Sequence, residues 1–289
     1  MRPVVAVTGA GGLVGAALSR ALERSGSEVR RLGRSGGAAR FALGEPVDDA
    51  ALAGASALLH CAWDFSAAGR DAGLRVNVEG SAALFKAARR AGVPRVVFVS
   101  SVSADPACAS DYGDAKRAAE AACAAEGGLS VRPGLVWRFP PAGLFGALER
   151  LAGSLPLLPV FDGGRQPFFT VHAEDLADAL VRALAWAPGE FSAPPALAHP
   201  DAVEFRDLLK GLAARRGRTL ATLSVPGGLA LAGLRALEGL GLKPPFRSDS
   251  LRGLLHTPAS IDPGPARRRG ARFRPFLGEP ARENGIIAP

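Results

Sequence analysis

The stretch VVAVTGAGGLVGAAL, residues 4–18, joins an apolar run to a glycine-rich turn and then to a helical pattern. The run from Pro3 to Val7 has the composition of a central strand that is covered on both faces. Residues 12–26 (GLVGAALSRALERSG) have helical spacing, and Gly26 ends the pattern. The stretch therefore predicts a strand, a tight turn and a helix as the first unit of the fold.

The turn between them holds glycines in the spacing G-x-x-G-x-x-G. Glycine lets the backbone turn sharply and approach an anion at the N-terminus of the following helix without a side chain in between. In the first strand–helix unit, that anion is typically the pyrophosphate of a dinucleotide. A tight turn without any ligand is the alternative. We expect cofactor contacts from Gly9, Gly12, Leu13, Val14 and Gly15.

Outward from this unit, apolar strands alternate with helical patterns as far as residue 185. The predicted strands are 27–32, 55–63, 95–103 and 129–137, and the predicted helices are 48–54, 77–92 and 112–128. Residues 168–185 add another strand and helix. Such alternation predicts an α/β fold with a doubly wound parallel sheet, the Rossmann arrangement.

Proline and glycine become frequent after residue 138, and the clean alternation stops. We expect a dinucleotide-binding domain over residues 1–185, in which residues 138–167 contribute to the substrate cleft. Residues 186–289 are expected to form a smaller substrate-binding cap. At 289 residues and 48% hydrophobic content, the chain is large enough for one main core and an appendage.

Charge and cysteine content exclude several classes of partner. The net charge is +8, but the arginines are scattered outside residues 265–275 and no nucleic-acid motif accompanies them, so no nucleic-acid partner is expected.

Three cysteines without metal-ligand spacing predict a reduced, cytoplasmic protein without a metal site. The chain starts on its first strand, so we predict no signal peptide. Residues 225–242 carry Arg235 and Glu238 and predict an amphipathic helix rather than a membrane span, so no membrane partner is expected.

The end of the second predicted strand bears on the choice of dinucleotide. An acidic residue there accepts hydrogen bonds from the ribose 2′-hydroxyl of NAD, whereas an arginine accommodates the 2′-phosphate of NADP. Here Gly33 stands at the acid position and Arg34 follows it. We therefore expect Arg34 to bind NADP, with NAD as the less favoured cofactor; simple solvent exposure of the arginine is the alternative.

Tyr112 is the single tyrosine of the chain, and Lys116 stands four residues later. Four residues make about one helical turn, so both side chains emerge on the same face. A phenol beside a fixed ammonium is a candidate proton donor. To lower the pKa of a phenol from 10 to near 7, the phenolate must be stabilised relative to the neutral phenol by about 4 kcal/mol. A neighbouring ammonium and an oxidised nicotinamide are the expected sources.

Seven short segments occur in an order similar to that of a known superfamily. They are TGAGGLVG (8–15), LLHCA (58–62), VNVEG (76–80), VVFVSS (96–101), YGDAK (112–116), RPG (132–134) and FFTVHAED (168–175). With these segments the chain resembles the extended short-chain dehydrogenase/reductase superfamily, also called the NAD-dependent epimerase/dehydratase family. The resemblance covers about residues 3–185.

The resemblance implies a role for each matching residue. Ser101 is expected to hydrogen-bond the substrate oxygen, Tyr112 to exchange a proton with it, and Lys116 to hold the cofactor ribose and lower the pKa of Tyr112. Asn77 resembles the asparagine that supports the lysine through water; a plain helix cap is the alternative. The nicotinamide half of the cleft is expected to be lined by Ala62, Tyr112, Lys116, Pro133 and Gly134.

Other polar or aromatic residues near these segments have less specific interpretations. His60 is expected to be a satisfied core residue, and His172 and Asp175 to be structural. Trp63 and Phe65 follow the strand that ends near Ala62, and lining the substrate pocket and simple packing are equally weighted for them.

The chain also departs from the sugar-nucleotide members of the family. The interval from Ser101 to Tyr112 is short, Trp137 stands where many members have tyrosine, and the cap is apolar with no second anion site. These departures favour an NADPH-dependent carbonyl reductase or dehydrogenase acting on a small carbonyl or hydroxyl compound. A sugar or sugar-nucleotide epimerase/dehydratase is the first alternative, and a non-catalytic NADP(H) sensor or scaffold is the second. A homodimer through the alanine-rich helices at 81–91 and 113–126 is also expected.

Overall fold

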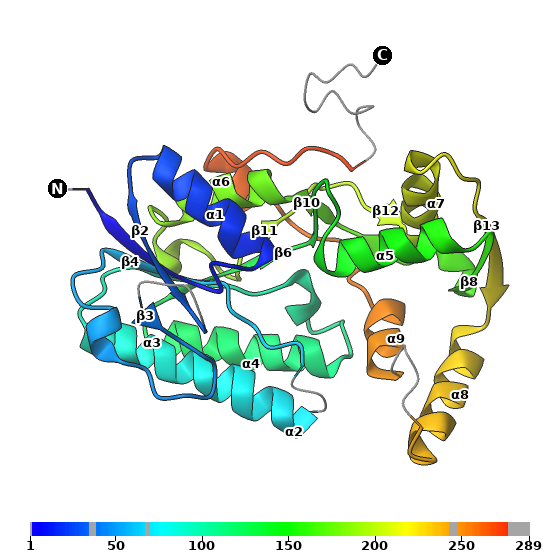
Figure 1. Ribbon diagram of the computed structural model, residues 1–289, viewed down its shortest axis with the longest axis horizontal. Helices are drawn as coiled ribbons and strands as arrows, with labels where there is room; N and C mark the ends of the chain where they lie inside the picture. Colours follow the sequence, from blue (N-terminus) through cyan, green and yellow to red (C-terminus); the bar gives the residue numbers. More distant parts are fainter. Residues whose placement is uncertain (1, 35–38, 67–69, 243–247, 277–289) are drawn as a thin grey trace.

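The computed structural model describes residues 2–34, 39–66, 70–242 and 248–276, with a seven-stranded parallel sheet in its larger half (Figure 1). From one edge to the other, the strands are β3 (Ala39–Arg40), β2 (Glu28–Gly33), β1 (Val4–Thr8), β4 (Ala57–His60), β5 (Val96–Val99), β6 (Leu129–Pro133) and β11 (Ala196–Leu197). Each neighbouring pair is parallel. This order confirms the predicted doubly wound Rossmann sheet.

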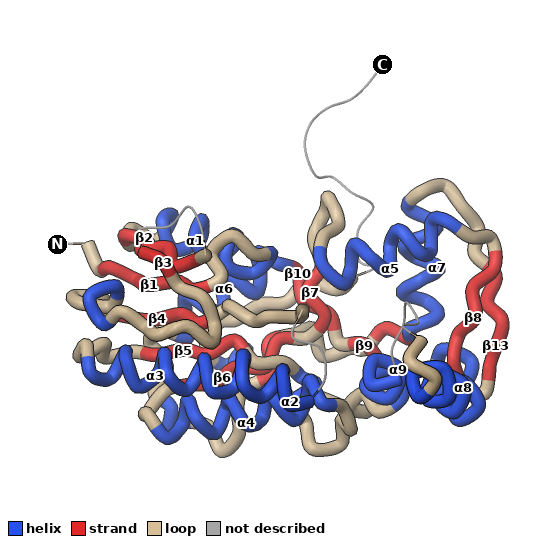
Figure 2. The backbone as a smooth tube through the Cα atoms, turned by 60° about the horizontal axis from the view of Figure 1, so that its bottom comes forward, coloured by secondary structure: helices blue, strands red, loops and turns tan. Residues whose placement is uncertain are grey.

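Helices cover both faces of the sheet (Figures 1 and 2). On one face, α1 (Leu13–Arg24) packs against α6 (Ala173–Ala183), and on the other, α3 (Gly80–Arg90) packs against α4 (Asp111–Ala125). Fully buried leucines fill the first interface, including Leu18, Leu22, Leu176 and Leu180. Each such leucine contributes roughly 1.5–3 kcal/mol relative to exposure, so the apolar stripes of the helices hold the layers together.

Two predicted elements differ in the structure. The predicted helix over 48–54 is a single 3₁₀ turn, Asp49–Ala51, because Asp48 accepts a bond from the Ala50 N–H and the left-handed Gly54 (φ 70°) redirects the chain. The predicted strand over 129–137 is divided at Gly134 into β6 and β7 (Leu135–Trp137). A side chain at Gly134 would overlap the Phe169 carbonyl, and beyond this point the chain leaves the main sheet to pair with β10 (Thr170–His172).

A second core lies at the other end of the molecule, shown on the right in Figure 2. It is built mainly by α5 (Gly143–Ser154), α7 (Phe205–Arg215) and β8 (Leu157–Phe161), and β13 (Ala221–Val225) pairs with β8 beside it. Phe145 is fully buried there. The remaining elements are α2 (Arg70–Gly73), β9 (Pro167–Phe168), β12 (Val203–Glu204), α8 (Gly227–Gly239), α9 (Ser248–Leu255) and α10 (Gly264–Arg268).

The C-terminal part of the chain contacts both cores. Ala266 of α10 packs into the core around α1 and α6, whereas Phe276 packs into the second core. Between them, the Arg274 backbone and guanidinium donate hydrogen bonds to Asp175. The division into domains at residue 185 stays a prediction, and β11 joins the main sheet from beyond that position.

Phe145→Ala tests whether the second core depends on its aromatic centre. Phe145 is fully buried, so truncation is expected to lower the free energy of unfolding by about 3–5 kcal/mol. Leu144→Ala is the matched control on the same helix, because Leu144 is 63% exposed and its loss is expected to change stability little. Chemical denaturation of both variants measures the difference, and equal effects would contradict this description of the core.

Candidate active site

The glycine turn brings three backbone segments into contact at the carboxyl edge of the sheet. Gly9 has φ 66°, and a Cβ there would lie 2.8 Å from the Ala62 nitrogen. A Cβ on Gly15 would overlap the Gly9 carbonyl, and the Gly12 N–H donates to that same oxygen at 2.9 Å. Only glycine fits at positions 9 and 15, so the start of α1 can pack directly against the ends of β1 and β4.

The N-terminus of α1 fits an anionic ligand. Gly12 is its N-cap without a side-chain hydrogen bond, and no acidic residue occupies the first turn. The first N–H groups, at Leu13, Val14 and Gly15, therefore present the positive end of the helix dipole. A Cβ on Gly11 would meet no atom within 4 Å, so the turn is open on that side. These residues suit the pyrophosphate of a dinucleotide.

The end of β2 carries cationic rather than acidic side chains. Arg31 pairs with Glu23 at 2.6 Å, and Arg30 donates to the carbonyls of Ala51 and Ala53. Arg34 is exposed and directly follows Gly33. Arg34 is therefore positioned next to the end of β2, where the adenosine ribose of a dinucleotide lies in this fold.

Ser101 and Tyr112 come together at the edge of the sheet beyond β5. Ser101 begins a short turn, Val102–Ala104, and its Oγ accepts a bond from the Ser103 N–H at 3.1 Å. Tyr112 lies in the first turn of α4, where Ser110 caps the Gly113 N–H at 3.0 Å. The Ser101 hydroxyl is near enough to the Tyr112 phenol to lower its pKa. Ser101 and Tyr112, two of the four residues expected to take part in catalysis, therefore lie together in the structure.

Gly113 makes this approach of α4 to the serine turn possible. A Cβ at position 113 would overlap the Ser103 carbonyl oxygen. Any other residue would push the first turn of α4, and Tyr112 with it, away from Ser101. The sequence analysis gave Gly113 no role, although a glycine inside an otherwise alanine-rich helix is a signal of close backbone packing.

Lys116 is buried one turn after Tyr112. Its Nζ donates to the Val99 carbonyl at 2.9 Å and lies 3.7 Å from the centre of the Trp63 ring. Burial lowers the pKa of Lys116 to about 7, against the opposing effects of Cys61 and Glu120. The lysine is thus held in an aromatic, poorly hydrated environment, where a charge is costly.

In the chain by itself the pKa of Tyr112 lies above its usual value, whereas the lowering expected from the sequence requires Lys116 together with an oxidised nicotinamide. Burial raises it to about 12, and the hydrogen bond from Ser101 lowers it only in part. The expected lowering by Lys116 is not among the causes. The physical reason is desolvation: Trp63 packs edge-on against Tyr112 with ring centres 5.9 Å apart, and Phe65 stacks on it at 6.0 Å. The Tyr112 phenol therefore carries its proton at neutral pH.

Asn77 holds the loop that carries both aromatic rings. It is buried in a wide helical turn, Leu74–Glu79, that leads into α3. Its Oδ1 accepts from the Asp64 N–H at 2.7 Å, and its Nδ2 donates to the Asp64 carbonyl at 3.0 Å. Asn77 is thus neither a plain surface residue nor the N-cap of α3. A role through water toward Lys116 stays a prediction.

The histidines and Asp175 have the structural roles expected of them. His60 hydrogen-bonds to Thr8 and Ser81 at 2.6 and 2.9 Å, and burial lowers the pKa of its ring to about 3, so it is neutral. His172 accepts from the Glu174 N–H at the start of α6, and Asp175 binds Arg274. Among the described residues, no cluster of three potential metal ligands occurs, and no metal site was predicted.

Ala62, Pro133 and Gly134 lie at the carboxyl ends of their strands. The Ala62 N–H donates to Thr8 Oγ1 at 3.3 Å, just after β4. Pro133 ends β6, and Gly134 lies between β6 and β7. The structure places all three on the same edge of the sheet as the glycine turn. Their contacts with nicotinamide stay a prediction.

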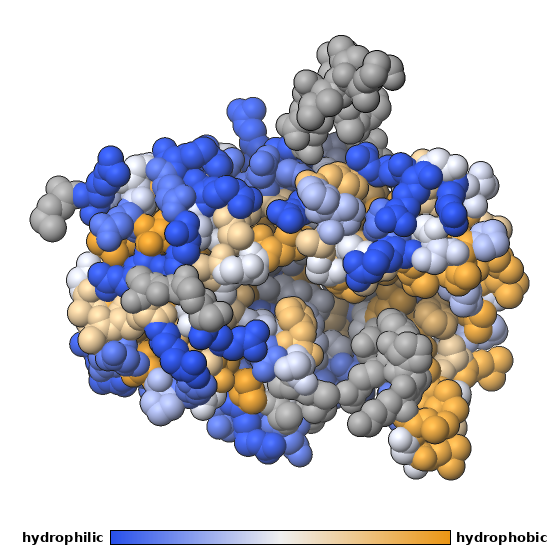
Figure 3. Space-filling view, viewed as in Figure 1, coloured by the Kyte–Doolittle hydropathy of each residue, from blue (hydrophilic) through white to orange (hydrophobic). Residues whose placement is uncertain are grey.

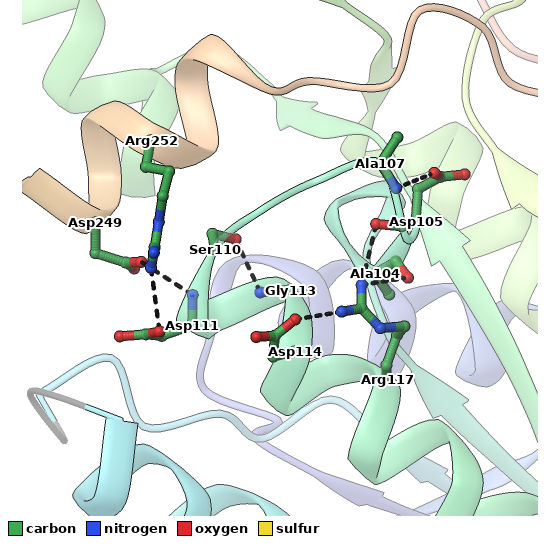
Figure 4. A network of polar contacts seen from close by, with 10 residues as sticks. All are labelled: Ala104, Asp105, Ala107, Ser110, Asp111, Gly113, Asp114, Arg117, Asp249 and Arg252. Atoms are coloured by element: carbon green, nitrogen blue, oxygen red, sulfur yellow. Dashed lines mark hydrogen bonds and ion pairs between the residues drawn. The ribbon is translucent and has the colours of Figure 1, made fainter. Parts of the chain in front are cut away.

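A polar network fixes the start of α4 from both sides (Figure 4). Asp249 of α9 accepts from the Asp111 N–H at 2.9 Å, and Arg252 donates to both Asp111 and Asp249. On the other side, Arg117 binds Asp114 and the carbonyl oxygens of the serine turn. The sequence gives no signal for the link to α9, because its partners are separated by 138 residues.

Comparisons with known proteins agree with this fold. Residues 5–131 match the model of the NAD dependent epimerase/dehydratase family. A ceramide reductase of Caulobacter vibrioides is 35% identical over 194 residues, which are 62% of this chain and 60% of that protein. The crystal structure of gox2253 superposes with a TM-score of 0.72 at 22% identity, covering 95% of this chain and 94% of the other. TunA, an NAD-dependent NDP-hexosamine 5,6-dehydratase, gives 0.70 at 19% identity over 96% and 94%.

The parallel sheet and the glycine turn give the chain a fold of the short-chain dehydrogenase/reductase type. More particularly, residues 5–131, less than half of the chain, match the NAD dependent epimerase/dehydratase family. The resemblance inferred from the sequence is thereby confirmed, and the expectation of an enzyme is confirmed at the level of the family. The two solved structures support the fold alone.

Lys116→Met tests the burial of the ammonium group. The pKa of Lys116 is about 7 in the folded chain and 10.5 in the reference state, so only the unfolded chain keeps this proton between those values. Stability from this group therefore increases as pH rises above 7. The wild-type chain is expected to gain about 2 kcal/mol more than Lys116→Met between pH 7 and 9. Denaturant titrations of both proteins at the two pH values measure this difference; identical pH dependence would show that the lysine is not buried.

Proposed function

We propose that the protein is an NADPH-dependent reductase of an apolar carbonyl compound. The observation that carries this proposal is the aromatic wall beside the proton donor. Trp63 and Phe65 both contact the Tyr112 ring, and Phe65 is 80% exposed. An exposed phenylalanine next to the reacting hydroxyl offers apolar surface to whatever enters. A sugar hydroxyl would gain little from such a surface.

The site residues have complementary tasks in this reaction. When bound, the nicotinamide cofactor supplies or accepts the hydride. Ser101 donates a hydrogen bond to the carbonyl oxygen, which prepares that oxygen for the proton that Tyr112 delivers. The Val99 carbonyl and the Trp63 ring hold the Lys116 ammonium one helical turn from Tyr112. Because the pKa of Lys116 is about 7, nearby charges can change the fraction of the lysine that is protonated. Asn77 keeps the aromatic loop in place.

Reduction of a carbonyl compound requires a protonated phenol at the start of the reaction. Burial raises the pKa of Tyr112 to about 12, so the phenol carries its proton at neutral pH. The 35% identity to a ceramide reductase, over 60% of that protein, supports an apolar substrate of the same broad kind.

The preference for NADP over NAD also belongs to this proposal. Arg34 follows a strand end without a carboxylate, and the preceding arginines at 30 and 31 already have partners. A 2′-phosphate would therefore meet a cation and no acidic group. The NAD named for family members such as TunA supports a nicotinamide cofactor in general.

Two other functions are less well supported. Sugar-nucleotide epimerase or dehydratase chemistry is favoured by the family and by the fold of TunA, but that structure is only 19% identical. A non-catalytic NADP(H) sensor would have no use for the paired hydroxyls of Ser101 and Tyr112. A homodimer through α3 and α4 and a cytoplasmic location complete the proposal.

Tyr112→Phe tests the assignment of the proton donor. Because the variant keeps the ring and loses the proton, kcat for NADPH-dependent reduction is expected to fall about a hundredfold or more. Binding of NADPH, followed by nicotinamide fluorescence, is expected to stay within a few-fold. Activity is measured on alkyl ketones of increasing chain length and on a UDP-hexose.

Ser101→Ala is expected to lower kcat in the same assay, and Ser103→Ala is its matched control in the same turn. Turnover of the UDP-hexose but not of the ketones would contradict a reductase of apolar carbonyls. Full activity of Tyr112→Phe would remove Tyr112 from the chemistry.

Arg34→Ala tests the choice of cofactor. Loss of the cation is expected to weaken NADPH binding about tenfold, equivalent to about 1.4 kcal/mol, and to leave NADH binding unchanged. Arg31→Ala is the matched control, because Arg31 lies on β2 shortly before Arg34 and is held by Glu23 of α1. Dissociation constants of both cofactors for each variant give the answer; equal loss for NADH and NADPH would show that Arg34 does not contact the 2′-phosphate.

A further inference from the structure

Exposed large apolar side chains are concentrated at one end of the molecule. Ten are found among the described residues, and all except Phe65 belong to α5, β8, β13, α8 and their flanks, between residues 144 and 242. We call this set the apolar end; it comprises Leu144, Leu151, Leu155, Leu157, Leu223, Leu229, Leu237, Leu240 and Leu242. Figure 3 shows apolar surface over α8 and along the adjoining β8–β13 end. Soluble proteins scatter such residues singly, so a cluster marks a contact surface.

The outward face of α8 is apolar along its length. Leu229 and Leu240 are 71% and 77% exposed, and Ala232 and Ala236 are exposed between them. A Cβ placed on Gly233 would meet no atom within 4 Å. A helix on the surface of a soluble protein normally turns polar residues outward. Here the outward stripe is the apolar one.

The ribbon of β8 and β13 continues this surface. Leu157 and Leu223 are 49% and 56% exposed, whereas Leu158 and Val160 between them point into the second core. The outer face of a two-stranded ribbon is ordinarily polar. The apolar end therefore spans a helix and a ribbon and is broader than a single groove.

The charges at this end are asymmetric. Arg150 of α5 and Arg235 of α8 are exposed. Glu149 is paired with Arg216, whereas Asp162 and Glu238 accept hydrogen bonds from neutral donors and keep their charge. Residues 143–165 and 216–242 together carry five arginines and three carboxylates, so the apolar end has a net positive charge and suits a partner that is apolar and anionic.

A second copy of the chain fits this pattern less well. A symmetric pair would cover the leucines but would leave the excess arginines of both copies without acidic partners, which costs binding energy. An anionic bilayer offers both complements at once, since leucines enter the boundary between headgroups and acyl chains while arginines meet phosphates.

We propose that the apolar end docks the protein peripherally on the surface of an anionic lipid bilayer. No helix in the described part of the chain is long and apolar enough to cross a membrane, so the contact is superficial. This differs from the expectation of no membrane partner, which treated residues 225–242 as an ordinary amphipathic helix. Exposure of the apolar stripe is the observation that changes it.

The docking surface is connected to the candidate active site by hydrogen bonds. Glu238 of α8 accepts from the Ser248 backbone and hydroxyl at 2.9 and 2.6 Å. The helix that begins at Ser248 is α9, whose Asp249 and Arg252 hold Asp111 beside Tyr112 (Figure 4). A lipid-bound α8 is therefore tied to the helix that carries the proton donor. The docking itself requires no turnover and stands independently of the proposed reaction.

Vesicle flotation with the full-length chain tests the docking. The wild-type protein is expected to float with vesicles of phosphatidylcholine and phosphatidylglycerol, and less with phosphatidylcholine alone, because the arginines require anionic headgroups. Leu229→Gln/Leu240→Gln is expected to lower the bound fraction about tenfold. Both leucines are exposed, so circular dichroism and NADPH binding are expected to stay unchanged.

Arg235→Glu and Arg20→Glu form a matched pair with the same change in net charge. Arg20 is exposed on α1, far from the apolar end in the fold, so only Arg235→Glu is expected to weaken vesicle binding by several-fold. Equal loss for both variants would show attraction by net charge alone and overturn the proposal. Failure of the wild-type protein to float would also overturn it, as would a dimer that Leu229→Gln/Leu240→Gln dissociates in the absence of any vesicle binding.

Discussion

The rest of the structure depends on one constraint, which is the direct backbone–backbone contact at the glycine turn. Gly9 lies against the Ala62 backbone, and Gly15 lies against the Gly9 carbonyl. This close approach lets α1 start at the carboxyl edge of the sheet with uncapped N–H groups facing outward. The dinucleotide-binding edge, the packing of α1 on α6 and the position of the loop after β4 follow from the same contact.

Aromatic packing decides the electrostatics of the candidate site. Trp63 lies over the Lys116 ammonium and against Tyr112, and Asn77 fixes the backbone between Trp63 and Phe65. These contacts remove water from both titratable groups, so the pKa of the lysine falls while that of the tyrosine rises. The environment thus stabilises the neutral form of each group and favours proton donation by Tyr112.

The C-terminal half of the chain also holds residues of the candidate site in place. Through Asp249 and Arg252, α9 fixes the first turn of α4, and through Glu238 it is joined to α8. The segment near Arg274 binds Asp175, and Phe276 fills the second core. The order of the site therefore depends on residues that lie far along the chain from every motif in the first half.

Local pattern was sufficient to predict the doubly wound sheet and the glycine turn, because strand and helix periodicities and glycine spacing are local properties. The set of Ser101, Tyr112 and Lys116 is proposed from the resemblance of short segments to a known family. Tertiary structure alone decided the split of the strand at Gly134, the close packing at Gly113, the clamp from α9 and the direction of the Tyr112 pKa shift. Each of these depends on which distant atoms exclude water or occupy space. These contacts exist only in the tertiary structure, and the spacing of residues along the sequence does not predict them.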